Sequence, residues 1–148
     1  MRIKDIVNPR AGWRVGQKNL ETTMGRLLLD GVAQRIDLFI TRQRGDAMTE
    51  AEKLRPGEYD LLIGCGGDGT INEIVNGLMR GGCHIPLAII AAGTSNDFAY
   101  SMRLPNDPDA FCAMVKRGLT QDIDIGCANG SYFINVASFG MFTDVAHN

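Results

Sequence analysis

A compact apolar segment, Tyr59–Cys65, runs directly into a glycine-rich loop and then into a helical pattern. The spacing of the apolar residues after the loop predicts a helix over Thr70–Arg80. Its inward face would carry four of them: Ile71, Ile74, Val75 and Leu78. A strand that feeds a helix through a tight loop is the building unit of an α/β fold. This one segment therefore predicts a sheet covered by helices.

The same alternation extends along most of the chain. Apolar or alternating runs predict three further strands at Arg2–Val7, Arg35–Thr41 and Leu87–Ala91. Helical spacing predicts helices at Gln17–Val32, Asp46–Leu54 and Pro108–Arg117, with a short helix after Gly93–Asp97. Strands separated by helices favour parallel pairing. The predicted fold class is α/β, with a Rossmann-like parallel sheet and helices on both of its faces.

The pattern changes near residue 120. Two runs, Thr120–Cys127 and Ser131–Phe139, alternate apolar and polar residues on either side of Asn129-Gly130. Asn-Gly between alternating runs is a strong hairpin signal, so the chain is predicted to switch to antiparallel strands. Exposed apolar residues of such a hairpin could pair two copies of the chain into a homodimer: Phe133, Ile134, Val136 and Phe139.

Composition excludes several function classes. A formal net charge of -2 over 148 residues argues against a nucleic-acid partner. No apolar run reaches the length of about eighteen residues that a membrane-spanning helix needs, and the first residues lack the apolar core of a signal peptide. The four cysteines have no metal-binding or redox spacing, so we expect reduced thiols and a cytoplasmic location.

Three loops follow the carboxyl ends of predicted strands: Asn8–Gly12, Gly64–Thr70 and Gly93–Asp97. In an open α/β sheet, ligands bind at that edge. The central loop carries Gly66-Gly67-Asp68-Gly69-Thr70, whose glycines let backbone N–H groups approach a phosphate at a helix N-terminus. The carboxylate of Asp68 would repel that phosphate, so we expect it to face Mg2+, a bound water or a hydroxyl. The alternative is a tight turn that Asp68 or Thr70 caps.

Residues outside the central loop complete the predicted site. Arg10 or Arg14 could meet a phosphate or lie in solvent. Thr41 could bond a base or ribose, or it could cap a helix or simply end its strand. In the third loop, Ser95 or Asn96 could cap the short helix. Asp97 could accept a proton from an acceptor hydroxyl or hydrogen-bond to it.

Four motifs together resemble a known family. The run GGDGTINEIVNGL at Gly66–Leu78 looks like the signature of the diacylglycerol kinase catalytic domain family. Three further motifs stand in the family's order: Asn8-Pro9 with Gly12, Thr41 with Gly45-Asp46-Ala47, and GTSNDFA at Gly93–Ala99. Tyr100 departs from the pattern, because the family usually has arginine there.

The resemblance implies an ATP-dependent lipid kinase that uses Mg2+, on the fold shared with NAD kinases and phosphofructokinases. By motif position it implies nucleotide contacts at Asn8, Pro9, Arg10, Ala11, Gly12, Thr41, Gly66, Gly67, Asp68, Gly69, Thr70, Ile71, Asn72 and Thr94. Asp68 and Asp97 would be the catalytic residues. Asp124 matches an aspartate of the family's metal network, so Asp68 and Asp124 would hold Mg2+ through water.

The family also carries a second, β-rich domain that supplies the catalytic base. We therefore expect a nucleotide-binding α/β domain over residues 1–120 and the first strands of a truncated β-rich domain over residues 121–148. This chain alone would then bind nucleotide weakly and transfer little phosphate. The implied partners are a lipid with a free hydroxyl and, by peripheral contact, a membrane. Two alternatives stay open: an NAD or sugar-phosphate kinase, and a non-catalytic nucleotide-binding or interaction module.

Overall fold

Parallel strands form the central sheet of the computed structural model, which describes residues 1–10, 13–93 and 95–134. The strands are β1 (Arg2–Val7), β2 (Arg35–Ile40), β3 (Leu61–Gly66) and β4 (Leu87–Ala91). They lie in the order β2-β1-β3-β4, and every neighbouring pair is parallel. Strands that are consecutive in the sequence are joined by crossovers that contain a helix, as the sequence predicts.

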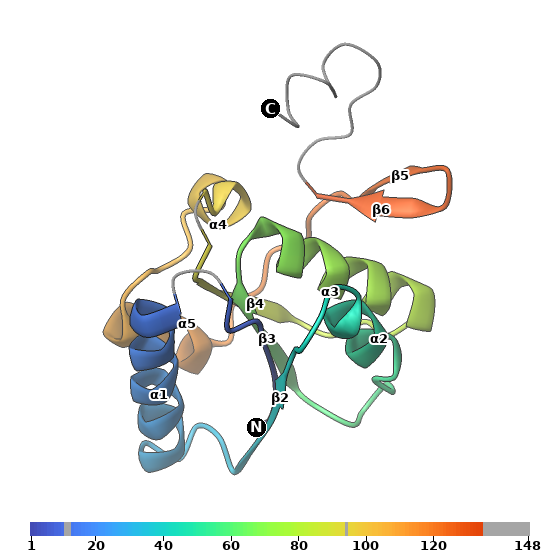
Figure 1. Ribbon diagram of the computed structural model, residues 1–148. Coiled ribbons are helices and arrows are strands. Elements are labelled where there is room, and N and C mark those ends of the chain that lie inside the picture. Colours follow the sequence, from blue (N-terminus) through green and yellow to red (C-terminus); the bar gives the residue numbers. More distant parts are fainter. Residues whose placement is uncertain (11–12, 94, 135–148) are drawn as a thin grey trace.

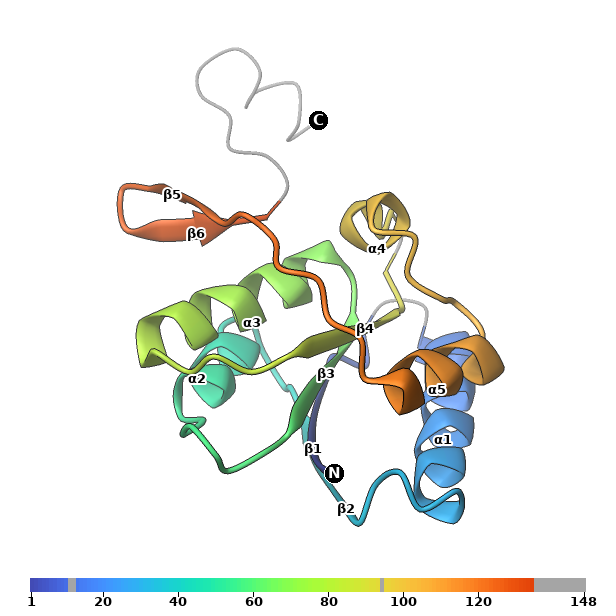
Figure 2. The same cartoon turned by 180° about the vertical axis from the view of Figure 1, so that it is seen from behind.

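Helices cover both faces of this sheet (Figure 1). One face carries α1 (Trp13–Leu29) and α5 (Pro108–Arg117), and the other carries α2 (Asp46–Glu52) and α3 (Asp68–Gly81). The short helix α4 (Asp97–Ser101) lies beyond the carboxyl end of β4. The view from behind shows the same two layers (Figure 2). The predicted fold class is therefore confirmed, and no described helix is long and apolar enough to cross a membrane.

Alternation along the strands produces two separate cores, because successive side chains point to opposite faces of a sheet. Ile3, Val7 and Ile63 pack against α1 and α5. Ile6 and Leu62 pack against α2 and α3. All five side chains are fully buried, and each contributes roughly 1.5–3 kcal/mol of apolar transfer free energy.

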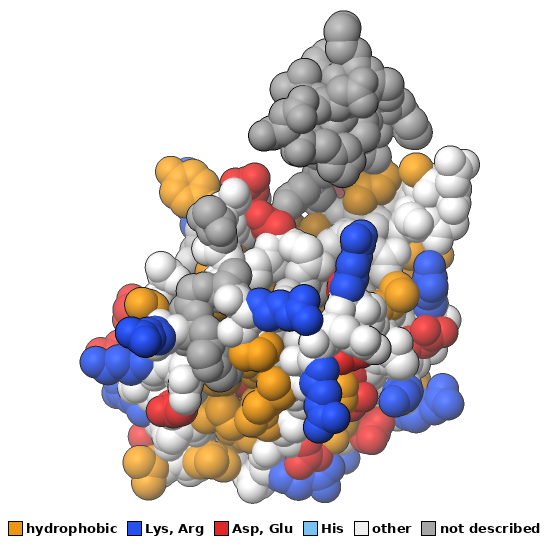
Figure 3. Space-filling view, viewed as in Figure 1, with side chains coloured by type: hydrophobic (Ala, Val, Ile, Leu, Met, Phe, Trp, Pro, Cys, Tyr) orange, Lys and Arg blue, Asp and Glu red, His pale blue; other side chains and the backbone are white. Residues whose placement is uncertain are grey.

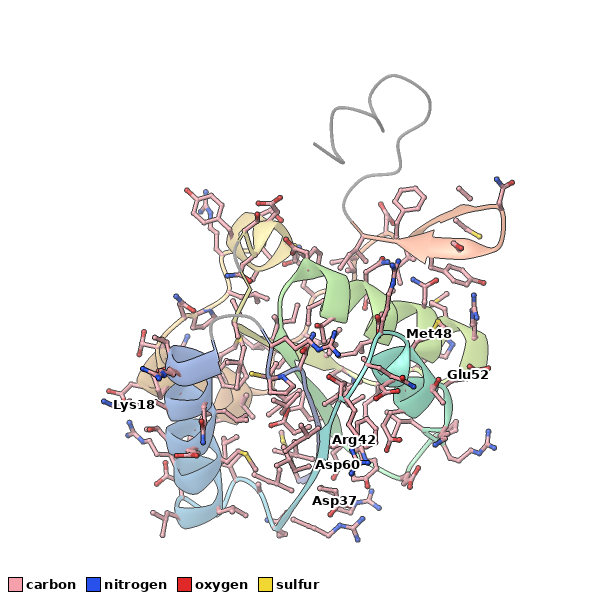
Figure 4. All side chains as sticks on the ribbon, in the orientation of Figure 1. Lys18, Asp37, Arg42, Met48, Glu52 and Asp60 are labelled. Atoms are coloured by element: carbon pink, nitrogen blue, oxygen red, sulfur yellow. The ribbon has the colours of Figure 1, made fainter. Side chains whose placement is uncertain are left out.

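The contact between α2 and α3 is unusually close. A Cβ atom on Gly77 would lie 2.2 Å from the carbonyl oxygen of Met48, and one on Gly81 would lie 2.5 Å from that of Glu52. Met48 and Glu52 are labelled on α2 in Figure 4. Only glycine fits at these positions, so the spacing of α2 and α3 is fixed by the sequence of α3.

Helices α1 and α3 differ from the prediction in where they begin or end. The helix α1 begins at Trp13, before the predicted Gln17, and ends at Leu29, before the predicted Val32. Gly31 has a φ of 71°, in the left-handed region, just past this end. The helix α3 begins at Asp68, two residues before the predicted Thr70, so the glycine loop already contains the first helical turn.

The chain ends its described part in a short hairpin. Strands β5 (Gly126–Ala128) and β6 (Ser131–Phe133) pair antiparallel. Asn129 and Gly130 both have positive φ, at 49° and 76°, as a two-residue hairpin turn requires. The hairpin is confirmed, but the prediction of a strand from Thr120 is wrong: residues 120–125 are mostly exposed and pair with no described strand. Val136 and Phe139 lie outside the described residues.

Hydrogen bonds and apolar packing tie this hairpin to the α/β layer. The amide of Asn76 in α3 donates to the carbonyl oxygen of Tyr132 at 2.8 Å and accepts from the N–H of Tyr132 at 2.9 Å. Asn76 is buried, and its amide pairs with β6 as a neighbouring strand would. Tyr132 and Ile134 also pack against the core between the sheet and α3.

Candidate functional site

Four segments meet at the carboxyl edge of the sheet: residues 8–10, 41–46, 66–70 and 93–97. Each follows one of the four parallel strands. Hydrogen bonds and close backbone contacts join every one of these segments to another. The edge is therefore a connected structure, as expected for the ligand-binding side of an α/β sheet.

The centre of the site is the start of α3. Gly67 occupies the N-cap position with an extended backbone, and no described side chain caps this end. The first intrahelical bond runs from the N–H of Ile71 to the carbonyl of Gly67, at 3.1 Å. The N–H groups of Asp68, Gly69 and Thr70 therefore have no partner within the helix. Together with the helix dipole, they form a site suited to a phosphate.

Two glycines bring the second and third loops into direct backbone contact. A Cβ atom on Gly93 would lie 2.4 Å from the Cα of Gly67, which no side chain tolerates. Beside this contact, the N–H of Ala92 donates to the carbonyl of Gly66 at 3.0 Å. The close approach explains why glycine stands at both positions, independently of any ligand.

Asp68 reaches from the start of α3 to the start of α4. Its carboxylate accepts from the N–H of Asp97 at 2.8 Å and from the N–H of Phe98 at 3.1 Å. The sequence predicts that this carboxylate faces Mg2+, a bound water or a hydroxyl, and the structure adds two backbone N–H groups of α4 as its donors. The cap of α4 comes from this aspartate and not from Asn96, whose side chain bonds Gly93 instead, at 2.8 Å to both its N–H and its carbonyl.

The first loop is tied to its neighbours by two side chains. The amide of Asn8 donates to the hydroxyl of Thr70 at 2.9 Å. Arg10 donates from its guanidinium to the carbonyl of Arg42 at 2.8 Å. The N–H of Arg10 donates back to the side chain of Asn8 at 3.1 Å, which closes a tight turn. Asn8 and Arg10 thus hold the site together whether or not they also touch a ligand.

Glu73 connects α3 to the loop after β2. Its carboxylate accepts from the N–H of Gly45 at 3.1 Å, and Gly45 has a φ of 93°. Asp46 accepts from the N–H groups of Arg42 and Gln43. These backbone hydrogen bonds lower the pKa of Asp46 below its ordinary value. The loop over residues 41–46 is therefore held as a defined shape beside the glycine loop.

The other predicted residues have varied positions. Thr41 is buried, and its N–H donates to the carbonyl of Val7 at 2.8 Å. The side chain of Ile71 belongs to the core, so only its backbone lies at the site. Pro9 is half-buried, while Asn72, Asp97 and Asp124 are exposed. Ala11, Gly12 and Thr94 lie outside the described residues.

The aspartates do not gather into a metal centre within residues 1–10, 13–93 and 95–134: no three His, Cys, Asp or Glu side chains are grouped there. Asp124 is exposed, and no three such side chains that include it are grouped in that part of the chain. The carboxylate of Asp68 still fits an indirect role, because each oxygen accepts one N–H and keeps a second lone pair. A water bound to Mg2+ could occupy it.

The sequence motifs did not reveal the roles of Glu73 and Asn96. Glu73 follows the glycine motif directly, but its partner Gly45 lies on another element, and only the packing of α2 on α3 brings the two together. From the sequence, Asn96 is a candidate cap of the short helix. Its left-handed backbone, with a φ of 53°, turns its side chain back to Gly93.

Comparison with known proteins gives a consistent result. The family model described as the diacylglycerol kinase catalytic domain matches residues 2–128. A diacylglycerol kinase of Staphylococcus epidermidis is 37% identical over 146 residues, covering 99% of this chain and 46% of that protein. A diacylglycerol kinase of Staphylococcus aureus is 35% identical with the same coverage. The crystal structure of a diacylglycerol kinase from Bacillus anthracis has a TM-score of 0.74 and 31% identity, covering 90% of this chain and 46% of that one. The chain thus spans about half the length of the relatives it matches.

Proposed function

The chain belongs to the diacylglycerol kinase catalytic domain family, and on that premise we propose that it is the ATP-binding part of a lipid kinase. The whole enzyme would transfer the γ-phosphoryl group of ATP to a lipid hydroxyl. The observation that carries this proposal is the uncapped start of α3, surrounded by the loops that follow all four parallel strands.

The nucleotide would lie along the carboxyl edge of the sheet. Its phosphates would accept from the N–H groups of Asp68, Gly69 and Thr70, and the dipole of α3 would stabilise their negative charge. The segments 8–10 and 41–46 would flank the rest of the nucleotide. Phosphoryl transfer depends mostly on positioning and electrostatics, so a rigid phosphate site supplies a large part of what it needs.

Mg2+, when bound, would neutralise charge on the phosphates. Asp68 is the residue of this chain best suited to orient it, through a water on its free lone pairs. Asp124 is the second candidate for holding Mg2+, and only its match to an aspartate of the family supports it.

Asp97 is the proposed contact of the acceptor hydroxyl. Its side chain is exposed at the start of α4, while its N–H is fixed by Asp68. The base that takes the hydroxyl proton is proposed to come from the β-rich part that the longer relatives carry, with residues 121–148 as its beginning. The 148-residue chain alone should therefore bind nucleotide weakly and turn over slowly.

The proposed partners follow from this chemistry. The acceptor would be a lipid with a free hydroxyl, met by peripheral contact of a cytoplasmic protein with a membrane. The net charge of -2 supports no nucleic-acid partner. A homodimer through residues 131–139 stays a prediction, since part of that segment lies outside the described residues.

A labelled-phosphate assay tests the proposal. Protein from the complete reading frame, given γ-labelled ATP, Mg2+ and diacylglycerol in mixed micelles, should place label in a chloroform-soluble product. Label only in water-soluble NADP or a sugar phosphate would instead support another kinase on this fold. Nucleotide binding without any labelled product would instead support a non-catalytic nucleotide-binding module.

A further inference from the structure

The chain contains two Asn-Gly pairs, Asn76-Gly77 and Asn129-Gly130. Asparagine is a thermolabile residue, and it is most reactive before glycine, because glycine has no side chain to shield its backbone nitrogen. That nitrogen can attack the amide carbon of the preceding asparagine and expel ammonia. Both pairs have the same local sequence chemistry, so their surroundings in the fold decide which of them reacts.

Helix α3 holds the first pair in place. Asn76 is only 7% exposed. Its amide nitrogen donates to the carbonyl oxygens of Asn72 and Tyr132, both at 2.8 Å, and its oxygen accepts from the N–H of Tyr132. Gly77 lies inside the helix, so its N–H belongs to the helical ladder, and its Cα lies close to the backbone of Met48. The amide carbon of Asn76 and the nitrogen of Gly77 therefore cannot rotate into contact unless α3 opens.

The second pair forms the tip of the hairpin. Ala128 and Ser131 are the last paired residues of β5 and β6, so Asn129 and Gly130 lie outside the ladder. Both are exposed, and both have positive φ, at 49° and 76°. Figure 3 shows uncharged polar side chains and backbone, drawn in white, at this outer end of the hairpin. Water therefore reaches both residues, and only the tip has to open for them to react.

We propose that Asn129-Gly130 is a site of spontaneous covalent modification, at which Asn129 becomes aspartate and isoaspartate. In the first step the backbone nitrogen of Gly130 bonds to the Cγ of Asn129, and the bond from Cγ to the side-chain nitrogen breaks. The side-chain nitrogen leaves as ammonia with the proton of the Gly130 N–H, and a succinimide ring remains. In the second step water opens the ring at either of its carbonyls. The whole reaction consumes water and releases ammonia, without any oxidation or reduction.

The two products differ in the main chain. Opening of the ring at the side-chain carbonyl gives aspartate, and Asp-Gly favours the same type of hairpin turn as Asn-Gly. Opening at the main-chain carbonyl gives isoaspartate, in which the chain continues through the side-chain carbon and is longer by a single atom. Both products add a negative charge at the tip, to a chain whose formal net charge is already -2. Only isoaspartate changes the length of the turn.

The longer turn would disturb the pairing of β5 with β6. The two-residue turn fixes a register in which Gly126 lies opposite Phe133, whose ring covers it so closely that a Cβ atom on Gly126 would lie 2.2 Å away. An extra main-chain atom shifts β6 relative to β5 and moves Tyr132 away from its hydrogen bonds with Asn76. The isoaspartyl form should therefore have a loosened hairpin, whereas the aspartyl form keeps it. The proposal is independent of the lipid kinase activity.

Peptide mapping by mass spectrometry tests the site. The folded chain is incubated in neutral buffer for increasing times, digested and compared with fresh chain. Asn129 should show the mass increase of an amide that becomes an acid, at a rate at least roughly tenfold above that of Asn76, because a helix opens far less often than a hairpin tip. In urea both pairs lie in an unfolded chain, so their rates should become similar. A folded chain that keeps Asn129 intact, or one in which both pairs react equally fast, would overturn the proposal.

Hydrogen–deuterium exchange tests the consequence for the hairpin. In the isoaspartyl fraction of incubated chain, the N–H of Tyr132 should exchange at least roughly tenfold faster than in fresh chain, because its bond to Asn76 is lost. Asn129→Gly is the matched control, since a Gly-Gly turn keeps the two-residue hairpin and has no amide to lose. Fresh Asn129→Asp carries the new charge in a main chain of normal length and should exchange like the fresh parent. Faster exchange after incubation of Asn129→Gly, or equally fast exchange in fresh Asn129→Asp, would overturn the role of isoaspartate.

Discussion

The carboxylate of Asp68 accepts a 2.8 Å hydrogen bond from the backbone N–H of Asp97. A second bond, from the N–H of Phe98, makes this carboxylate the cap of α4. The residue proposed to orient Mg2+ is therefore also the residue that caps α4, the helix that begins at the proposed acceptor contact Asp97. A change at Asp68 should therefore alter the start of α4, and a change at the start of α4 should alter the position of the Asp68 carboxylate.

Replacement of Asp68 tests that link. Asp68→Ala removes two charge-assisted bonds, each worth about 1.5–3 kcal/mol, and should release the start of α4. Hydrogen–deuterium exchange without nucleotide and without Mg2+ should show faster exchange at Asp97 and Phe98. Asp30→Ala, an exposed aspartate at the end of α1, is the control. Unchanged exchange in Asp68→Ala would mean that the cap does not form in solution.

The contact between Gly67 and Gly93 predicts a steric effect. Gly93→Ala places a methyl group 2.4 Å from the Cα of Gly67, so the two loops must separate. We expect a loss of about 1–3 kcal/mol in the free energy of unfolding and a clear loss of nucleotide affinity. Calorimetry and chemical denaturation measure both. Gly25→Ala in α1 meets nothing within 4 Å and should instead stabilise by about 0.5–1 kcal/mol.

Asp5 predicts an unusual pH dependence. It is fully buried in β1, and neither carboxylate oxygen has a partner among the described residues. Burial raises the pKa of this carboxyl from 3.8 to about 8. The folded chain therefore keeps a proton that the unfolded chain releases, and stability should fall by up to about 5 kcal/mol as the pH rises from about 4 to about 8.

Two variants separate the charge at Asp5 from its polarity. Asp5→Asn cannot ionise and should flatten this pH slope, while Asp5→Val should also be more stable than the parent chain at pH 8, by about 2–5 kcal/mol. Urea denaturation between pH 5 and pH 9 measures both. Asp37, Asp46 and Asp60 have lowered pKa values, so the stability they add is lost only at more acidic pH. A slope that persists in Asp5→Asn would assign it to another group.

Asn76 predicts a local effect on the hairpin. Asn76→Ala leaves both the N–H and the carbonyl of Tyr132 without their partner, at a cost of about 1–3 kcal/mol. Residues 126–134 should exchange faster and become sensitive to limited proteolysis, while the exchange of the sheet stays unchanged. Arg80→Ala, on the exposed surface of the same helix, is the control. Equal protection of the hairpin in both variants would show that the hydrogen bonds from Asn76 do not hold it.

Much of the fold could be predicted from local pattern. Strands β1, β2 and β4 and helix α5 match their predicted spans to within a residue, because periodicity and flanking glycine or proline mark them. The segment before β5 alternates in the same way, yet residues 120–125 form no strand. A strand needs a neighbour to pair with, and the alternation of a segment says nothing about whether one is present.

The loops that form the site could be predicted from the sequence, but the hydrogen bonds between them could not. Topology brings the loops after β1, β3 and β4 together, which sequence order already implies. The bonds between Glu73 and Gly45 and between Asn76 and Tyr132 depend on the rotation of α3 against its neighbours. That rotation is set by tertiary packing. Within α3, Gly77 and Gly81 indicate from the sequence which face of the helix lies against α2.

Because β6 is attached to Asn76, the helix α3 connects the hairpin to the glycine loop. The helix begins at the proposed phosphate site, and Asn76 lies about two turns further along it. If a ligand displaced the first turn of α3, the helix would therefore transmit that displacement to the hairpin. By thermodynamic reciprocity, a force or a partner acting on the hairpin would change the affinity at the glycine loop by the same factor.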